Sequence, residues 1–369
     1  MDLYVFDKDL NRLGLIDDFI ELEIQRYYTK MGQLYMIVEG NHETINLLQE
    51  GRILAKADDM EHGYLILTRE YLDEKSTQLH IIAPSLNTLL SRRILFGQQS
   101  FKGSVENVMK SFVQVNAVTP VNPNRQISNL YISSSKGMPI NGEEVGIGKQ
   151  LDEFLYEVAN KHDVSWSILM DAHNKRFIFD VWQGTDRSAE QSVNPHVIFS
   201  KDRENVLRQH YIESDNDYKN VAIVAGEGEG AARTLITVND NVSGWDRVEL
   251  FVDARDLQST YRDESNQEIT LSPSAYQNLL VERGKSKLAE FQKIITFESD
   301  IDLYANGVYG VDYFLGDIVS VKNDDLGIIL HTRIVSAIEK TTKQGTSLQV
   351  NFGSNIPSFL DKVKRAVKN

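Results

Sequence analysis

The segment from Val221 to Arg233, VAIVAGEGEGAAR, has the composition most suggestive of chemistry, because a strand-like run leads into closely spaced glycines. A glycine-rich turn after a strand can bring backbone N–H groups close to phosphates. The dinucleotide fingerprint, however, is G-x-G-x-x-G at the start of a helix, whereas this spacing is G-x-G-x-G and the β-branched run TLITV follows. The glutamates between the glycines would also repel phosphates. We therefore expect Gly226, Gly228 and Gly230 to form a flexible hairpin loop that makes contacts and binds no cofactor.

The segment from Asn239 to Gly244 resembles the start of a calcium-binding loop, with oxygen-bearing side chains at alternate positions and glycine at the sixth. The twelfth position is Leu250, which cannot supply a bidentate carboxylate, and the ninth is Arg247. The sequence thus predicts a polar turn and no metal site.

Three carboxylates, Asp253, Asp256 and Asp263, lie close in sequence and are the natural candidates for hydrolytic chemistry. With 53 acidic residues in the chain, such clusters are unavoidable. The eight histidines form no H-E-x-x-H motif, and no serine stands in a G-x-S-x-G elbow. We therefore predict no catalytic residues and no enzyme.

The segment from Trp182 to Ser188, WQGTDRS, holds an acidic and a basic side chain next to each other. Asp186 and Arg187 fit two interpretations, which the sequence leaves open. They can form an ordinary solvated ion pair, which contributes little. Alternatively, Arg187 makes a bidentate contact that locks this region to a barrel or to a neighbouring subunit.

The segment from Gly310 to Val321 alternates apolar and polar residues and is interrupted at Leu315-Gly316-Asp317. Glycine adopts backbone conformations that other residues resist, and an aspartate can hydrogen-bond the nearby main chain. The pattern D-x-x-L-G-D-x-V therefore predicts a kinked strand that turns a corner. Its structural residues would be Asp312, Gly316 and Asp317.

Composition narrows the function classes further. The chain has no cysteine, which excludes a disulfide scaffold, thiolate zinc sites and a cysteine nucleophile. Its formal net charge of −14 argues against a surface that grips nucleic acid. The N-terminus lacks the pattern of a signal peptide, and no uncharged apolar stretch reaches about 18 residues. We expect a protein made in the cytoplasm that does not insert into a membrane.

The periodicities predict a mainly β protein with an α+β insert. Alternating runs dominate residues 1–99 and predict a tube-like antiparallel barrel or sandwich. Two amphipathic helices and a hairpin predict a small α+β domain over 100–200. Strand patterns return over 201–354 and predict a second tube-like barrel, interrupted by a helix at 272–293 in which Gly284 marks a bend or an end. Residues 355–369 predict a basic amphipathic helix at the C-terminus.

The chain resembles a family of phage and prophage tail proteins over nearly its whole length. The segments that carry this resemblance are FDKDLNRLGLIDDF (6–19), NLLQEGRILA (46–55), LLSRRIL (89–95), WQGTDRSAEQSVNPHVIFS (182–200), DYKNVAIVAGEGEG (217–230), RVELFVDARDL (247–257) and VDYFLGDIVSV (311–321). The resemblance implies the baseplate hub at the tail tip of a long-tailed phage or phage-like particle, similar to the trimeric hub of contractile tails. Two barrels per subunit would then form a pseudo-sixfold ring beneath the sixfold tail.

The resemblance also implies partners. They are two further copies in a homotrimer, the distal tail protein, the tape measure protein and a separate receptor-binding or spike protein. DNA would pass through the lumen without specific binding, and we expect lumen-facing strand positions to be net acidic, because a basic channel would bind phosphates. We also expect the C-terminal helix to dock on an acidic neighbour or to receive the next tail component.

Two other functions remain open from the residues. One is a tail-associated cell-wall hydrolase, which the carboxylate clusters would serve. The other is a host-glycan-binding module, for which Tyr27, Tyr28 and Trp182 would be exposed aromatic contacts.

Overall fold

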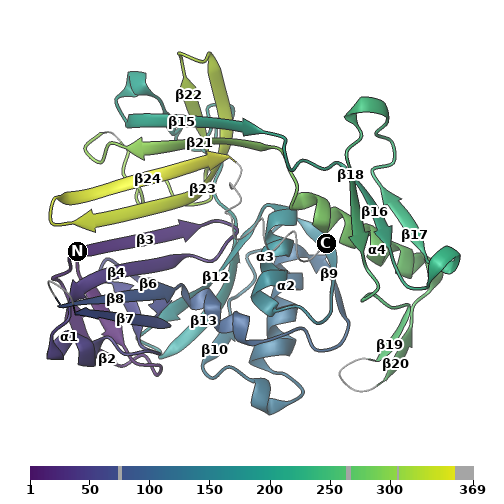
Figure 1. Ribbon diagram of the computed structural model, residues 1–369, viewed down its shortest axis with the longest axis horizontal. Coiled ribbons are helices and arrows are strands. Elements are labelled where there is room, and N and C mark those ends of the chain that lie inside the picture. The colour runs from purple at the N-terminus through teal and green to yellow at the C-terminus, as the bar shows by residue number, and fades with distance from the viewer. Residues whose placement is uncertain (74–76, 263–266, 306, 354–369) are drawn as a thin grey trace.

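The computed structural model describes residues 1–73, 77–262, 267–305 and 307–353. The protein is mainly β, as the sequence predicts, with few helices and several antiparallel sheets. Figure 1 shows an N-terminal and a C-terminal β region stacked on one side, an α+β insert in the middle and a small lobe at the far side. The C-terminal segment 355–369, predicted as a helix, lies outside the described residues.

The N-terminal region is a sandwich of two sheets around one core. Its first sheet has the strand order β2-β1-β5-β6, and its second layer contains β3, β4, β8 and β7. Alternation along β3 buries Leu22 and Ile24 against the facing sheet. The elements are β1 (Leu3–Phe6), β2 (Arg12–Ile16), β3 (Glu21–Tyr27), β4 (Gln33–Glu39), α1 (His42–Leu47), β5 (Ile53–Lys56), β6 (Asp59–Leu65), β7 (Thr68–Asp73), β8 (Thr77–Pro84) and the short helix η1 (Leu86–Arg92).

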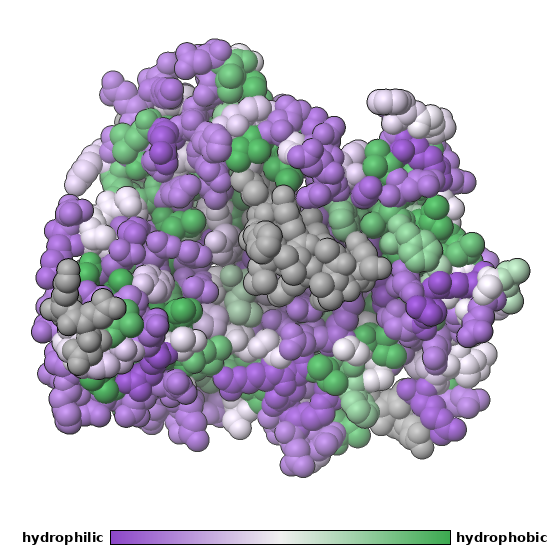
Figure 2. All heavy atoms as spheres, viewed as in Figure 1, coloured by the Kyte–Doolittle hydropathy of each residue, from purple (hydrophilic) through white to green (hydrophobic). Residues whose placement is uncertain are grey.

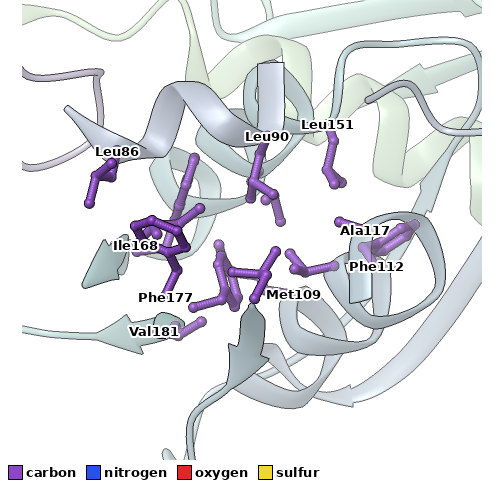
Figure 3. Close-up of a cluster of buried hydrophobic side chains, with 14 of the residues drawn as sticks. Leu86, Leu90, Met109, Phe112, Ala117, Leu151, Ile168, Phe177 and Val181 are labelled. Carbon is purple, nitrogen blue, oxygen red and sulfur yellow. The ribbon is translucent and has the colours of Figure 1, made fainter. Parts of the chain in front are cut away.

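The insert packs on the outer face of this sandwich. Along β5 the side chains alternate, so that Leu54 enters the sandwich core while Ile53 and Ala55 join the core of the insert. The core of the insert contains side chains from η1, from the helices and from the strands β12 and β13 (Figure 3). Its elements are β9 (Gln99–Ser104), α2 (Val105–Val113), η2 (Gln114–Val118), η3 (Pro123–Arg125), β10 (Leu130–Ile132), β11 (Asn141–Gly146), α3 (Leu151–His162), β12 (Ser165–Asp171) and β13 (Arg176–Trp182).

The C-terminal region continues the N-terminal sheet rather than forming a separate one. Strand β23 pairs antiparallel with β3, from Ser336 opposite Tyr27 to Thr342 opposite Glu21. The resulting sheet runs β15-β21-β24-β23-β3-β4-β8-β7. The first half of β23 instead pairs with β22, which carries β14 at its other side. The elements are β14 (Ile198–Phe199), η4 (Lys201–Arg203), β15 (Val206–Ser214), β21 (Ile294–Ile301), β22 (Ile318–Asn323), β23 (Ile328–Thr342) and β24 (Gly345–Gly353).

The strands predicted between 219 and 253 do not join this C-terminal sheet, which corrects the prediction of one barrel over 201–354. They form a small lobe in which β18 pairs parallel and β17 antiparallel with β16, and helix α4 covers one face. A notch separates the lobe from the C-terminal sheet in Figure 2. The lobe contains β16 (Val221–Ala225), η5 (Gly230–Ala232), β17 (Leu235–Val238), η6 (Gly244–Asp246), β18 (Glu249–Asp253), β19 (Thr260–Arg262), β20 (Glu268–Thr270) and α4 (Pro273–Ala289).

Helix α4 covers Pro273–Ala289 and so ends four residues before the predicted range 272–293 does. Ser272 caps its first turn by accepting a hydrogen bond from the Ala275 N–H. Gly284 does not end the helix, which continues through it to Ala289. A Cβ on Gly284 would stand 2.7 Å from Val238 and 2.8 Å from Val224. The glycine therefore lets the helix approach the sheet closely.

The prediction of a kinked strand over 311–321 is also wrong for the first half of that range. Only Ile318–Asn323 is a strand, and the preceding residues form successive turns. Gly310 and Gly316 both have positive φ, at 84° and 86°, which interrupts extended pairing. No helix in the described residues is long and apolar enough to cross a membrane.

Candidate functional site

The two segments that stand out in the sequence, Trp182–Ser188 and the turn at Gly316, cross each other in the structure. A Cβ on Gly184 would lie 1.9 Å from the carbonyl oxygen of Gly316. A Cβ on Gly316 would lie 2.7 Å from the rings of both Trp182 and Tyr28. Both positions therefore require glycine, because two backbones meet with no space for a side chain.

Asp317 is the polar centre of this crossing and is only 2 % exposed. Its Oδ1 accepts a hydrogen bond from the Thr185 N–H at 2.7 Å. Its Oδ2 accepts from Arg187 Nε at 2.8 Å and from the Phe314 N–H at 3.0 Å. The buried carboxylate thus has three donors, one of them charged, which compensates the cost of its burial.

The backbones on either side of this carboxylate also pair. The Ile318 N–H donates to the Thr185 carbonyl at 3.0 Å, and the Arg187 N–H donates to the Ile318 carbonyl at 2.7 Å. Asp186 stands opposite Ile318 in a parallel bridge, and its side chain accepts from the Ser188 N–H. Asp186 and Arg187 therefore do not form a solvated pair with each other. Arg187 locks its segment to the C-terminal region through Nε, instead of the bidentate contact that one interpretation expected.

A second cluster ties the N-terminal sandwich to the same place. Arg333 of β23 donates to the Gly316 carbonyl and, through Nε at 2.7 Å, to the Asp163 carboxylate of the insert. Its guanidinium stands 4.7 Å from the ring centroid of Tyr28, and the Tyr28 hydroxyl donates to the Asp163 carbonyl at 2.9 Å. Burial raises the pKa of Tyr28, so the hydroxyl stays a donor.

We call this set of contacts the junction: Tyr28, Asp163, Trp182–Ser188, Gly316–Ile318 and Arg333. It joins the sandwich, the insert and the C-terminal region at one point. Sequence reasoning singled out Gly316, Asp317, Asp186 and Arg187 but missed Gly184, Asp163 and Arg333. Asp163 follows the last turn of α3 with φ 52°, at a position where glycine is usual. An aspartate in place of glycine at the end of the helix pattern was the signal that the sequence offered. Tyr28, expected as an exposed aromatic, is 2 % exposed.

The three glycines of the GEGEG segment lie in the small lobe, and the contacts of the junction do not involve them. The hairpin expected there is present, because Ala225 pairs with Leu235 across the loop. A Cβ on Gly226 would lie 2.5 Å from the Tyr276 hydroxyl, which accepts from the Glu227 N–H. Gly228 and Gly230 have φ of 99° and 53° and allow the loop to turn.

The described carboxylates among the catalytic candidates form ion pairs with arginines. Asp253 accepts from Arg255 and Arg233, each at 2.6 Å, and these hydrogen bonds, first that of Arg255, lower the pKa of Asp253 to about 2. Asp256 pairs with Arg283 at 2.7 Å. Asp263 lies outside the described residues.

Two more predicted positions have local roles. Asp312 accepts from the Val308 N–H at 2.7 Å and closes a turn in the loop before Gly316. Asp240, in the calcium-like segment, pairs with Arg247 at 3.0 Å. Among the described residues, no group of three histidines or carboxylates is arranged to hold a metal ion.

The sequence matches the family model described as "Siphovirus ReqiPepy6 Gp37-like protein" over residues 2–354. The chain belongs to this family. None of the curated proteins compared with it matches. The family membership supports a structural role in a phage tail.

Solved structures share the fold of this family member. They include a tail protein from Neisseria meningitidis MC58 (TM-score 0.57, 12 % identity, 96 % of both chains covered). A prophage tail protein, gp18, from Listeria monocytogenes EGD-e is similar over 100 % of this chain and 99 % of its own (TM-score 0.54, 13 % identity). The 43 kDa tail protein of prophage MuSo2 from Shewanella oneidensis is similar over 95 % and 98 % (TM-score 0.56, 10 % identity).

Proposed function

We propose that this protein is the structural hub at the tail tip of a long-tailed phage or phage-like particle. Three copies would form a ring that joins the sixfold tail to the tip and surrounds the DNA channel. The observation that carries this proposal is the continuous sheet through β3 and β23, which places two β regions of one chain side by side. Three copies would present six such regions, which matches a sixfold tail.

The junction serves this function mechanically. Arg187 and Arg333 connect residues that are far apart in sequence through the buried turn at Gly316. Because the two β regions are also paired strand to strand, they would turn as one body within a ring. A ring subunit needs this property if the spacing of its two β regions is to match the tail above it.

The two end strands of the long sheet offer the surfaces for ring closure. Strand β15 carries Leu207 at 67 % exposure, and Tyr71 of β7 is 49 % exposed. Open strand edges with exposed apolar side chains favour pairing with another chain. In the proposed ring they would be covered by neighbouring copies or by the distal tail protein.

Native mass in solution tests the oligomeric part of the proposal. Light scattering or native mass spectrometry should give a trimer of three 41.9 kDa chains. The same measurement on a mixture with the distal tail protein tests whether the trimer forms only when that protein serves as a template. A monomer under both conditions would overturn the trimer.

The two other functions have less support. A cell-wall hydrolase would need free carboxylates, but Asp253 and Asp256 are bound by arginines. Of the three aromatics expected to serve a glycan-binding module, Tyr28 is buried in the junction, and Tyr27 and Trp182 are only partly exposed. We therefore propose neither.

A further inference from the structure

A crevice of about 940 Å³ opens where the sandwich, the insert and the C-terminal region meet. Its walls include Arg26 and Tyr64 from the sandwich, Trp166 from the insert, and Tyr309 and Tyr313 from the loop before β22. One end reaches the junction, but most of the crevice is not used by the contacts described above. Its volume is within the range of about 300–1,000 Å³ that is typical of ligand sites.

The charges of the crevice favour a cationic ligand. Its lining contains six carboxylates against three lysine and arginine side chains. Inside, Arg26 pairs with Asp59 at 2.7 Å and Lys56 with Glu339 at 3.0 Å. Asp180 and Asp317 also line the crevice and pair with Lys136 and Arg187. Asp58 is 75 % exposed and stands 3.6 Å from Lys56, and Glu61 is also exposed. These two would meet the basic groups of a ligand.

The loop on one side of the crevice adds an apolar surface. Leu303, Val308, Val311 and Phe314 all line the crevice, and their exposed fractions are 42 %, 52 %, 69 % and 44 %. Four exposed apolar side chains in one loop form a patch that a ligand would cover. The ligand should therefore carry positive charge and apolar side chains together.

We propose that the crevice is the docking site of the chain's own C-terminal segment, residues 354–369. The segment has four basic side chains and one acidic side chain, and its apolar residues are Ile356, Phe359, Leu360, Val363 and Val367. A basic, apolar polypeptide thus matches both properties of the crevice.

The segment can reach this site. Strand β24 lines the crevice with Thr346 and Leu348 and ends at Gly353. The five steps along the strand from Leu348 to Gly353 span about 17 Å at about 3.3 Å per residue. Sixteen residues extend up to about 50 Å at the same rise, which is enough to return from Gly353 to the crevice.

A cysteine cross-link in the full chain tests this docking, because the natural sequence has no cysteine to interfere. The test variant carries Val311→Cys at the crevice and Val363→Cys near the middle of the segment. The matched control carries Leu235→Cys, 62 % exposed in the small lobe, with the same Val363→Cys. Docking predicts that mild oxidation joins the first pair within one chain at least about tenfold faster than the control, because docking raises the local concentration.

A second arm tests the charge argument. Asp58→Lys with Glu61→Lys should slow the cross-link at Val311 about fivefold or more, because each repels the basic segment at short range. Asp17→Lys with Asp18→Lys changes two exposed carboxylates outside the crevice lining and should leave the rate unchanged. Circular dichroism checks that each variant is folded.

Three results would overturn the proposal. The first is an equal cross-linking rate at Val311 and Leu235. The second is a cross-link that forms only between chains, which would assign the segment to a neighbouring copy. The third is an unchanged rate in the Asp58 and Glu61 variant.

Discussion

Asp317 shows how one buried side chain can hold distant parts of this chain together. Its two oxygens accept from three donors, and the oxygen bound by Arg187 also receives the Phe314 N–H. Whichever way an asparagine were placed there, its amide N–H₂ would face at least one donor. The site therefore needs two acceptor oxygens, which a carboxylate supplies and an amide of the same shape does not.

We expect Asp317→Asn to lower the free energy of unfolding by about 2–4 kcal/mol, because it leaves a buried donor and the Arg187 charge without an acceptor. Urea denaturation followed by fluorescence measures the loss. Asp312→Asn is the matched control, since that exposed carboxylate accepts a hydrogen bond from the Val308 N–H whose loss should cost less than about 1 kcal/mol. Equal effects of the two variants would show that Asp317 has no special structural role.

Glu106 makes stability depend on pH. The side chain is fully buried, and burial alone would raise its pKa. It accepts hydrogen bonds from Lys110 Nζ at 2.6 Å and from the N–H groups of Lys136 and Met138. These hydrogen bonds outweigh the effect of burial and lower the pKa of Glu106 to about 2. Because folding lowers the pKa of Glu106 from 4.5, its ionised carboxylate stabilises the fold at pH values above about 4.5. This contribution is lost as the pH falls from about 4.5 to about 2.

We therefore expect Glu106→Gln to be less stable than the natural protein near neutral pH and to lose less stability on acidification through this window. Unfolding free energies at a series of pH values measure both effects. Glu143→Gln is the control, because Glu143 is a half-buried carboxylate that pairs with the exposed Lys102. If the two pH profiles of the natural protein and Glu106→Gln are parallel, the argument about Glu106 fails.

At the scale of elements, close packing of α4 on its sheet reverses the usual effect of alanine in a helix. An exposed glycine in a helix interior costs about 1 kcal/mol relative to alanine, so Gly→Ala normally stabilises. Gly284 has no space for the added carbon, because Val224 and Val238 stand within 3 Å of its position. The valines belong to β16 and β17, so a methyl group would push the helix away from both strands.

Gly284→Ala should therefore destabilise the protein by about 1–3 kcal/mol. Asn278→Ala, on an exposed position of the same helix, should instead be neutral or stabilising by a few tenths of a kcal/mol. Thermal unfolding of the two variants compares the signs. A stabilising Gly284→Ala would contradict the packing described for the lobe.

Local periodicity predicted most elements, but not which strands pair. The alternating runs over 1–99 include the strands β3, β4 and β8, and the two helices expected over 100–200 are present as α2 and α3. These features depend on neighbours in sequence. The pairing of β3 with β23 joins residues about three hundred positions apart, and no local pattern encodes it. The same holds for the separate lobe, whose strands alternate like those of a barrel.

The candidate site was predictable to the same extent. Glycine and aspartate at Gly316 and Asp317 indicated a special turn, because both residue types have known backbone roles. What the turn binds depends on Gly184, Asp163 and Arg333, which come from other parts of the chain. Their meeting is a property of the tertiary structure.

At the scale of the whole molecule, the paired strands and the junction make the two β regions one body, while the lobe projects to the side (Figure 1). A ring of three such bodies would have its lobes outward or toward the tip. The position of the lobe would then decide which tail protein it contacts.

The most direct test of the hub is a cryo-electron microscopy reconstruction of the tail tip of particles that contain this chain. The account predicts three copies at the tip, related by a threefold axis, with both β regions of each copy facing the channel. Any other copy number, or a position along the tube or on a side fibre, would contradict it.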